Sequence, residues 1–149
     1  MHLDHAPHGG ECLYHHHYAG GEFLPFYVPR DVMPQIDWQD LPALVDFLPS
    51  TGVEVTRLSG LDPRQLIAHQ RVDRRKALAI PAEALTKPVL VSSDHYILDG
   101  NHRWLAHALR RLPIDAWQLA LPFDPALDAL FRFPKTYSYG DGNQHPVTF

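Results

Sequence analysis

Residues 87–108 read KPVLVSSDHYILDGNHRWLAHA, and the strongest structural pattern of the chain lies within them. Two short apolar runs, at 89–91 and 96–98, predict two strands that meet near Asp94. In the second half of the segment, apolar residues recur at helical spacing and continue just beyond it, namely Trp104, Leu105, Ala108, Leu109 and Leu112. The Asp-Gly-Asn-His-Arg sequence at 99–103 is therefore predicted to form a strand-to-helix turn.

This turn has the composition of an anion-binding site. Gly100 permits a tight turn with close backbone approach, and the free N–H groups at a helix start, aligned with the helix dipole, attract anions. Asn101 is expected to cap the helix. His102 and Arg103 are expected to leave an exposed first turn, where a polyphosphate would meet an imidazole and a bidentate guanidinium. Asp99 could hold a divalent cation or accept a proton from an attacking hydroxyl.

A simpler interpretation of the turn is a capped helix whose histidine and arginine are solvated, since Asp-Gly and Asn are ordinary turn residues. Trp104 also has two interpretations, a stacking surface for a base or a core residue. Its place on the apolar stripe favours the core. His107 lies on the polar side of the helix and is predicted to be a surface residue.

A helix and a strand are predicted upstream of this segment. Asp40 can cap the helix, and Pro42 lies in its first turn. Its core-facing stripe consists of Leu41, Leu44, Val45 and Leu48. Alternating apolar and polar residues at 53–56 predict the strand. The Asp-Pro-Arg-Gln sequence at 62–65 has the form of a capping box, which would start a helical segment that runs to about Ala79 as one helix or two.

A further strand and a short helix are predicted downstream. Pro113 stops the preceding helix, and the alternation at 114–121 predicts the strand. The final helix is expected to start at Asp124, with Leu127, Leu130 and Phe131 on one side. The whole pattern predicts an α+β fold.

Chain length and composition suggest one compact domain with tails, because 149 residues are too few for two comfortable domains. We expect a flexible, histidine-rich arm at 1–30, a folded domain at 31–134 and an irregular tail at 135–149. The histidines of the arm and Cys12 do not have the spacing of a structural zinc site, so adventitious metal affinity is the expected property.

Several classes of protein are disfavoured. No stretch approaches the length of a membrane span, and the N-terminus lacks the basic-then-apolar pattern of a signal peptide. Cys12 is the only cysteine, so an intrachain disulfide is impossible. We therefore expect no membrane association and a cytoplasmic location.

The charge balance disfavours nonspecific coating of nucleic acid, because 13 basic and 17 acidic residues leave a formal net charge of −4. The local charge differs from this average. Arg71, Arg74, Arg75 and Lys76 form a cationic cluster, and Arg110 and Arg111 follow the motif helix. The cluster is either a solvated helix face or a contact for a polyanionic substrate.

The segment 87–108 closely resembles the signature of the ParB/sulfiredoxin superfamily, in which a strand, a D-G-x-H-R turn and a helix form a nucleotide-phosphate site. Met-Pro-Gln-Ile at 33–36 and Leu-Asp-Pro-Arg-Gln at 61–65 are similar to elements of phage-encoded members. The resemblance covers about residues 31–121. It implies a single ParB/sulfiredoxin-like domain with a small mixed sheet and flanking helices.

The superfamily shares the handling of nucleoside triphosphates. It includes partition proteins that hydrolyse CTP, sulfiredoxin, a kinase of free serine, and phage kinases of 5-hydroxymethyluracil in DNA. Asn101 stands where sulfiredoxin has a cysteine, and the chain lacks the long helix-turn-helix region of partition proteins. The resemblance thus implies an ATP- and Mg²⁺-dependent kinase that acts on the hydroxymethyl group of 5-hydroxymethyluracil in phage DNA, with no obligate protein partner.

The resemblance also implies roles for particular residues. Asp99 would hold magnesium or act as base, with Glu54 or Asp62 as alternatives for the base. The phosphates would contact Gly100, Asn101, His102 and Arg103, and the DNA backbone would contact Arg71, Arg74 and Arg75. Gln65 would orient the substrate, although its place in the capping box offers a purely structural role. The alternatives are a nucleotide-dependent DNA-binding module, a nuclease and a small-molecule kinase.

Overall fold

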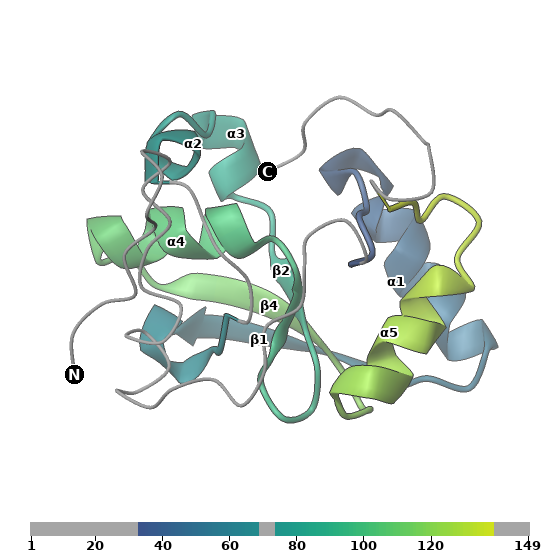
Figure 1. The fold of residues 1–149 in the computed structure, drawn as a ribbon. Helices are drawn as coiled ribbons and strands as arrows, with labels where there is room; N and C mark the ends of the chain where they lie inside the picture. The colour runs from purple at the N-terminus through teal and green to yellow at the C-terminus, as the bar shows by residue number, and fades with distance from the viewer. Residues whose placement is uncertain (1–32, 69–73, 139–149) are drawn as a thin grey trace.

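The computed structural model describes residues 33–68 and 74–138, and Figure 1 shows its arrangement of helices and strands. The elements are η2 (Trp38–Asp40), α1 (Leu41–Ser50), β1 (Val55–Leu61), η3 (Pro63–Gln65), α2 (Arg74–Leu78), α3 (Ala82–Leu85), β2 (Val89–Val91), β3 (Ile97–Asp99), α4 (Asn101–Arg110), β4 (Ile114–Leu119) and α5 (Phe123–Phe131). The predicted α+β fold is confirmed. No described helix reaches the length and hydropathy that crossing a membrane requires.

The four strands form one mixed sheet in the order β1-β4-β2-β3. β1 runs antiparallel to β4, and β2 runs antiparallel to β3, whereas β2 and β4 are parallel. In Figure 1, α2, α3 and α4 lie on one side of the sheet and α1 and α5 lie on the other. The small mixed sheet with flanking helices is therefore confirmed.

Alternation along the strands divides the core into two halves. Val89 and Val91 of β2 pack with α4, while Leu90 between them packs with α1 and α5. All three side chains are fully buried. A strand with apolar residues on both faces needs helices on both sides, which is why the short apolar run at 89–91 lies in the middle of the domain.

The predicted first helix is confirmed. Its stripe residues Leu41, Leu44 and Leu48 are buried. Asp40 occupies the N-cap position, but its side chain makes no capping hydrogen bond and instead forms an ion pair with Lys135 at 3.3 Å. The predicted N-cap position of Asp40 is therefore confirmed, but its side chain does not supply the capping hydrogen bond.

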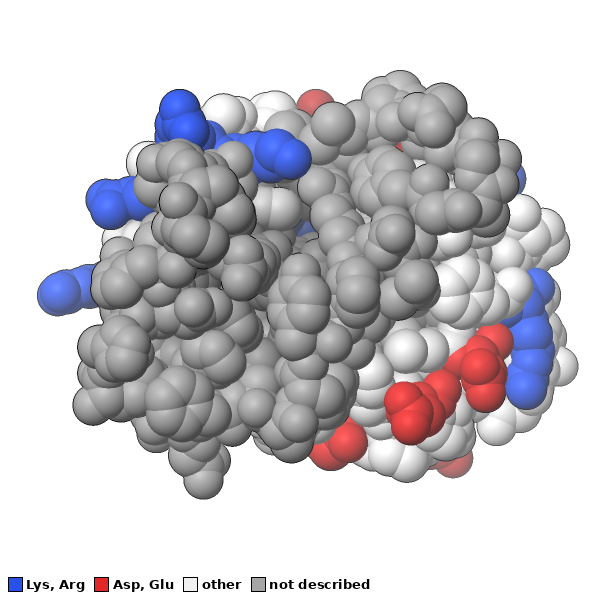
Figure 2. All heavy atoms as spheres, viewed as in Figure 1, with Lys and Arg blue, Asp and Glu red and all other residues white. Residues whose placement is uncertain are grey.

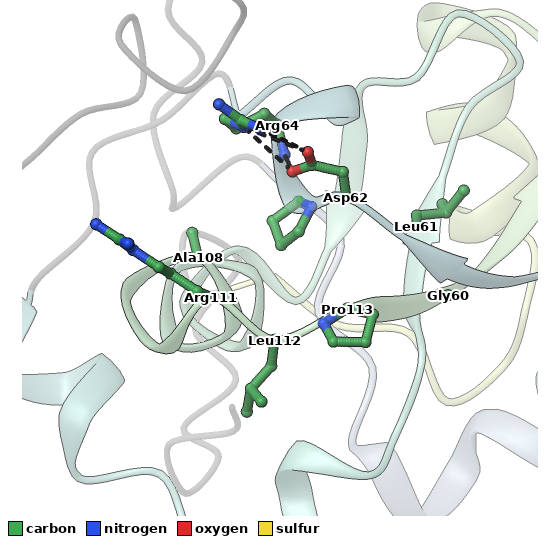
Figure 3. A pocket seen from close by; sticks show the side chains of 9 residues that line it. Gly60, Leu61, Asp62, Arg64, Ala108, Arg111, Leu112 and Pro113 are labelled. Atoms are coloured by element: carbon green, nitrogen blue, oxygen red, sulfur yellow. Dashed lines mark hydrogen bonds and ion pairs between the residues drawn. The ribbon is translucent and has the colours of Figure 1, made fainter.

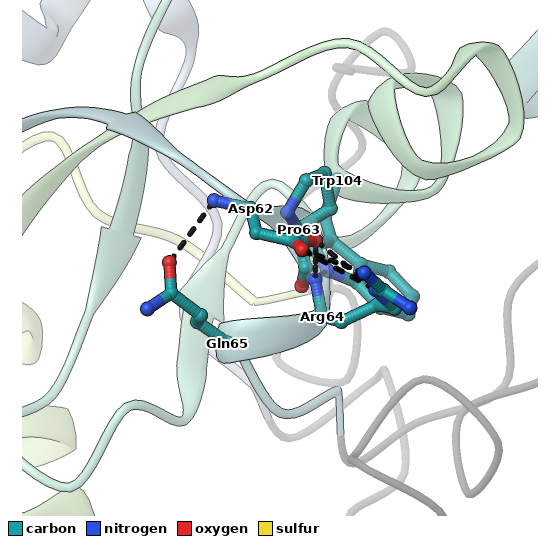
Figure 4. Close-up of polar contacts among 5 residues, drawn as sticks. All are labelled: Asp62, Pro63, Arg64, Gln65 and Trp104. Carbon is teal, nitrogen blue, oxygen red and sulfur yellow. Dashed lines mark hydrogen bonds and ion pairs between the residues drawn. The ribbon is translucent and has the colours of Figure 1, made fainter.

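The capping box at 62–65 is confirmed, but the long helix after it is not. Asp62 accepts a hydrogen bond from the Arg64 N–H at 2.9 Å, and Gln65 Oε1 accepts one from the Asp62 N–H at 3.0 Å (Figure 4). The turn is a single 3-10 turn, because the Ile67 backbone then pairs with the 95–97 backbone, at 2.9 Å in each direction. The next helix among the described residues is α2.

The final helix begins one residue earlier than predicted and presents a different face. Its buried residues are Phe123, Ala126, Ala129 and Leu130. Phe131, predicted to lie on the core side, is 45% exposed. Beyond the helix, Tyr137 is buried and exchanges two backbone hydrogen bonds with Gln35, of 2.7 and 3.1 Å. The two ends of the described chain are thereby held together.

The histidine-rich arm predicted at 1–30 lies outside the described residues, as does most of the tail predicted at 135–149. Arg71, assigned above to DNA contact, also lies outside them.

Candidate functional site

The β3–α4 turn is built around Gly100, which precedes the first residue of α4. Its φ of +99° lies in the left-handed region, which favours glycine. A Cβ at this position would come within 2.7 Å of Val89 Cγ1 and 2.8 Å of Arg103 Nη2. The carbonyl of Gly100 accepts the hydrogen bond of the Trp104 N–H at 2.8 Å, which closes the first turn of the helix. The turn thus needs glycine both for its conformation and for the close approach of β2.

Gly100, and not Asn101, occupies the N-cap position, so the predicted capping role of Asn101 is wrong. Asn101 is the first residue of the helix, where its side chain is too far along to cap it. Its Oδ1 atom is buried and has no hydrogen-bond partner. A buried acceptor without a partner is uncommon and suggests that a ligand or water supplies one.

The polar side chains of the turn are buried. Asp99 is 6% exposed, Asn101 and His102 are each 7% exposed, and Arg103 is 1% exposed. The expectation that His102 and Arg103 leave an exposed first turn is therefore wrong. The start of α4 lies against the beginning of β2, and this packing encloses the first helical turn.

Arg103 carries its charge inside the protein. Its Nη2 atom donates a hydrogen bond to the Pro88 carbonyl at 3.1 Å, and its Nε atom has no partner. Burial lowers the pKa of the Arg103 guanidinium, and the negative charge of Asp99 opposes that shift. Because arginine stays protonated in proteins, the site holds a desolvated cation with an unused donor, which is an environment that attracts an anion.

Asp99 is the sole carboxylate that the sequence motif places at this turn, and it lies close enough to Arg103 to act on its charge. No group of three or more His, Cys, Asp or Glu side chains among residues 33–68 and 74–138 could by itself hold a metal ion. Mg²⁺ commonly binds through one or two protein oxygens together with substrate phosphates. Asp99 and Asn101 carry oxygens of the type that such coordination uses.

Trp104 connects the turn to η3. Its ring is fully buried, as predicted, and its Nε1 atom donates a hydrogen bond to the Pro63 carbonyl at 2.7 Å (Figure 4). Gln65 lies on the same 3-10 turn, with its amide oxygen engaged by the Asp62 N–H. The structural interpretation of Gln65 is thus realised, and its substrate role stays a prediction.

Basic side chains accompany the turn on the same side of the sheet. Arg74 and Arg75 are exposed on α2, which packs against α4. Figure 2 shows basic groups at the end of the molecule where Figure 1 draws α2 and α4, whereas acidic groups gather over α5. Arg74 and Arg75 therefore lie on a helix that packs against α4.

A cavity of about 730 Å³ lies at the opposite end of α4. Figure 3 shows Asp62 and Arg64 on one side of it and Ala108, Arg111 and Leu112 on the other. Arg64 forms an ion pair with Asp62 at 2.9 Å, and hydrogen bonds from Arg64 lower the pKa of Asp62. Asp62 is thus held in an ion pair at the end of α4 opposite the Asp99 turn. Its lowered pKa makes it a weaker base, which disfavours it as the alternative base.

The His107 side chain is buried and contacts the backbone of two other segments, so the prediction that it is a surface residue is wrong. The side chain is 8% exposed. Its Nδ1 atom lies 2.9 Å from the Pro113 carbonyl oxygen, and its Nε2 atom lies 3.0 Å from that of Leu85. The ring therefore joins α4 to α3 and to the start of β4.

Replacing His107 with leucine is expected to lower the free energy of unfolding by about 2 kcal/mol, because the carbonyl that accepts from the ring N–H loses its partner and the other loses a polar neighbour, while the volume is nearly kept. Urea denaturation measures the change. His107→Gln, which keeps one donor, should lose less. Equal stability of the leucine variant and the wild type would show that these contacts contribute nothing.

Sequence reasoning missed the residues that shape the turn from a distance. Pro88 and Val89 lie at the start of β2, and their role at the α4 start has no sequence signal, because they are ordinary apolar residues. No protein-family model, characterised protein or solved structure matches this chain. The function must therefore be inferred from the chemistry of the turn itself.

Proposed function

We propose that this protein is a ParB/sulfiredoxin-like, ATP-dependent phosphotransferase whose acceptor is an alcohol, the hydroxymethyl group of 5-hydroxymethyluracil in DNA. The observation that carries the proposal is the buried Arg103 Nε donor without a partner, beside a glycine-capped helix start. An unsatisfied buried donor costs about 1–3 kcal/mol, and a phosphate oxygen would relieve that cost.

Phosphate groups match the turn in charge and in geometry. The first N–H groups of α4 have no acceptor within the helix, and the helix dipole adds positive potential at the same place. Gly100, which has no side chain, lets Val89 and the Arg103 guanidinium lie close to the backbone at the helix start. Arg103 would donate from Nε while its Nη2 stays on Pro88, so the guanidinium is already oriented before a nucleotide binds.

Magnesium would neutralise charge on the transferred phosphoryl group. Asp99 and Asn101 are the residues that would hold it, together with phosphate oxygens. Asp99 could also accept the proton of the attacking hydroxyl. His102, 7% exposed on the same turn, is the remaining imidazole for phosphate contact.

DNA as the polymer that carries the acceptor is supported by the cations of α2. Arg74 and Arg75 are exposed and lie on the helix that packs against α4. A chain of net charge −4 needs a concentrated basic surface to approach DNA. Phosphorylation of the hydroxymethyl group also has a chemical purpose, because a phosphate ester leaves far more readily than hydroxide.

The experiment that tests this proposal is incubation of the full chain with γ-labelled ATP, magnesium and one of three acceptors. Label should enter DNA that contains 5-hydroxymethyluracil and should not enter unmodified DNA or free serine. Label in serine would identify a small-molecule kinase, nicking of DNA would identify a nuclease, and nucleotide binding without transfer would identify a switch. Each of these outcomes contradicts the proposal.

Asp99→Asn should reduce turnover by roughly 10²-fold or more while ATP binding changes little, because the amide keeps the shape and loses the charge. Turnover and ATP affinity are measured separately. Asp128→Asn, an exposed carboxylate on α5, is the matched control and should behave as the wild type. Full turnover by Asp99→Asn would transfer the role to another carboxylate.

A further inference from the structure

A second cavity, of about 470 Å³, lies where the start of α1, the α3–β2 connection and the neighbouring strands β1 and β4 meet. Its lining includes two tryptophans and two cations, which are Trp38, Trp117, Lys87 and Arg57. None of the roles assigned above uses it. Both tryptophan rings are half-buried, so part of each is available to a ligand.

Each tryptophan in this cavity is accompanied by a positive charge. Lys87 Nζ lies 5.1 Å from the centroid of the Trp38 ring, and Arg57 Cζ lies 5.0 Å from that of Trp117. Arg57 also shares its charge with Asp115 through an ion pair at 3.0 Å, whereas Lys87 is half-buried. The lining of the cavity therefore combines aromatic surfaces with cations.

The cavity lies beside the candidate phosphate site. Pro88 lines it, and the carbonyl of the same residue accepts the hydrogen bond of Arg103. The next residue, Val89, is the one that approaches Gly100. A single extended segment, 88–89, thus separates the cavity from the β3–α4 turn.

We propose that this cavity is a nucleotide subsite, which takes a nucleobase against Trp38 and Trp117 and its phosphate at Lys87 and Arg57. Base stacking on aromatic rings together with cations along the backbone is the usual means of holding a nucleotide without reading its sequence. Gln39 and Asp46, which also line the cavity, supply polar groups for the edge of the base. The volume is within the range of small-ligand pockets.

The charges in the cavity disfavour a quaternary ammonium group, which is the other kind of ligand that paired tryptophans bind. An aromatic cage holds a quaternary ammonium group through the positive charge of the ligand. Here a lysine and an arginine already accompany the two rings, so a further cation would be repelled, whereas a planar base can stack on the part of each half-buried ring that stays exposed.

The role of the subsite rests on the proposed function, since it would position one nucleotide next to the phosphoryl-transfer turn. The nucleotide has two possible sources, the ATP donor and the DNA strand. Binding can be measured without turnover, so the subsite and the kinase activity are tested separately.

The test is fluorescence anisotropy of a labelled oligothymidylate with the full chain, with unlabelled ATP as competitor. Trp117→Leu should weaken binding roughly tenfold or more, whereas Trp117→Phe, which keeps an aromatic face, should retain most of it. Lys87→Met should weaken binding and reduce its salt dependence. Lys135→Met removes a cation that lies outside the cavity and is the matched control. Urea denaturation of each variant shows that it is folded.

Competition by ATP that disappears in Trp117→Leu would assign the subsite to the donor, and loss of oligonucleotide binding alone would assign it to the DNA strand. Wild-type binding by both Trp117→Leu and Lys87→Met would overturn the proposal, as would displacement of the probe by tetramethylammonium. Binding that depends on Trp117 in a protein without phosphotransfer would refute the kinase and leave the subsite. Unaltered binding and unaltered phosphotransfer in Trp117→Leu would refute the subsite and leave the kinase.

Discussion

Gly100→Ala is expected to lower the free energy of unfolding by about 3 kcal/mol. A left-handed residue with a side chain costs about 1–2 kcal/mol, and a methyl group pressed into a packed region costs a similar amount. Both costs apply here, because φ is +99° and the new Cβ would lie 2.7 Å from Val89 Cγ1. Relief of that contact would have to move either β2 or the Arg103 guanidinium.

Two other glycines separate these costs. Gly52 and Gly60 have φ values of +89° and +67°, and a Cβ at either position would meet nothing within 4 Å. Gly52→Ala and Gly60→Ala should therefore show the conformational cost alone, about 1–2 kcal/mol. Urea denaturation compares the three variants. A loss in Gly100→Ala no larger than in these two would mean that β2 does not press on the turn.

Arg103→Met is expected to lower both stability and activity. The side chain keeps its unbranched shape and loses its charge, which leaves the buried Asp99 carboxylate without the cation beside it. Removal of one partner of a buried charge pair typically costs about 3–5 kcal/mol. Loss of an oriented donor at a phosphate should reduce phosphotransfer by roughly 10²-fold or more.

The double variant Arg103→Met, Asp99→Asn separates the two effects. It removes both charges, so much of the lost stability should return, while phosphotransfer stays absent because neither group remains. Denaturation and labelled-phosphate transfer are measured on the wild type, both single variants and the double variant. Additive stability losses would show that Asp99 and Arg103 do not act on one another, and turnover in Arg103→Met would remove Arg103 from the phosphate site.

The elements next to the motif were predictable because their signals are local. Strands β2, β3 and β4 and helix α4 follow from runs and periodicities of apolar residues, and the capping box at 62–65 from four adjacent residues. The prediction of a helix that continues from the capping box was wrong, because the local sequence pattern there competes with backbone pairing to a distant segment. The capping box starts only a 3-10 turn, because the backbone of Ile67 pairs with a segment near Tyr96 instead of continuing a helix.

The sequence alone determined the alternation of strands and helices and the presence of a glycine turn rich in polar groups at 99–103. Tertiary structure alone decided that these groups are buried. Apolar periodicity identifies the face of a helix that packs, but it cannot distinguish a buried polar residue from a solvated one, since both interrupt the same pattern.

The contacts that bury these polar residues come from distant parts of the chain. Arg103 is bound to Pro88, 15 residues away, and His107 to Leu85, 22 residues away. Trp104 is bound to Pro63, 41 residues away. A backbone carbonyl is available at every residue, so no side-chain pattern marks which one will be the partner. Only the packing of β2, α3 and η3 against α4 selects those carbonyls, and with them the environment of the candidate phosphate site.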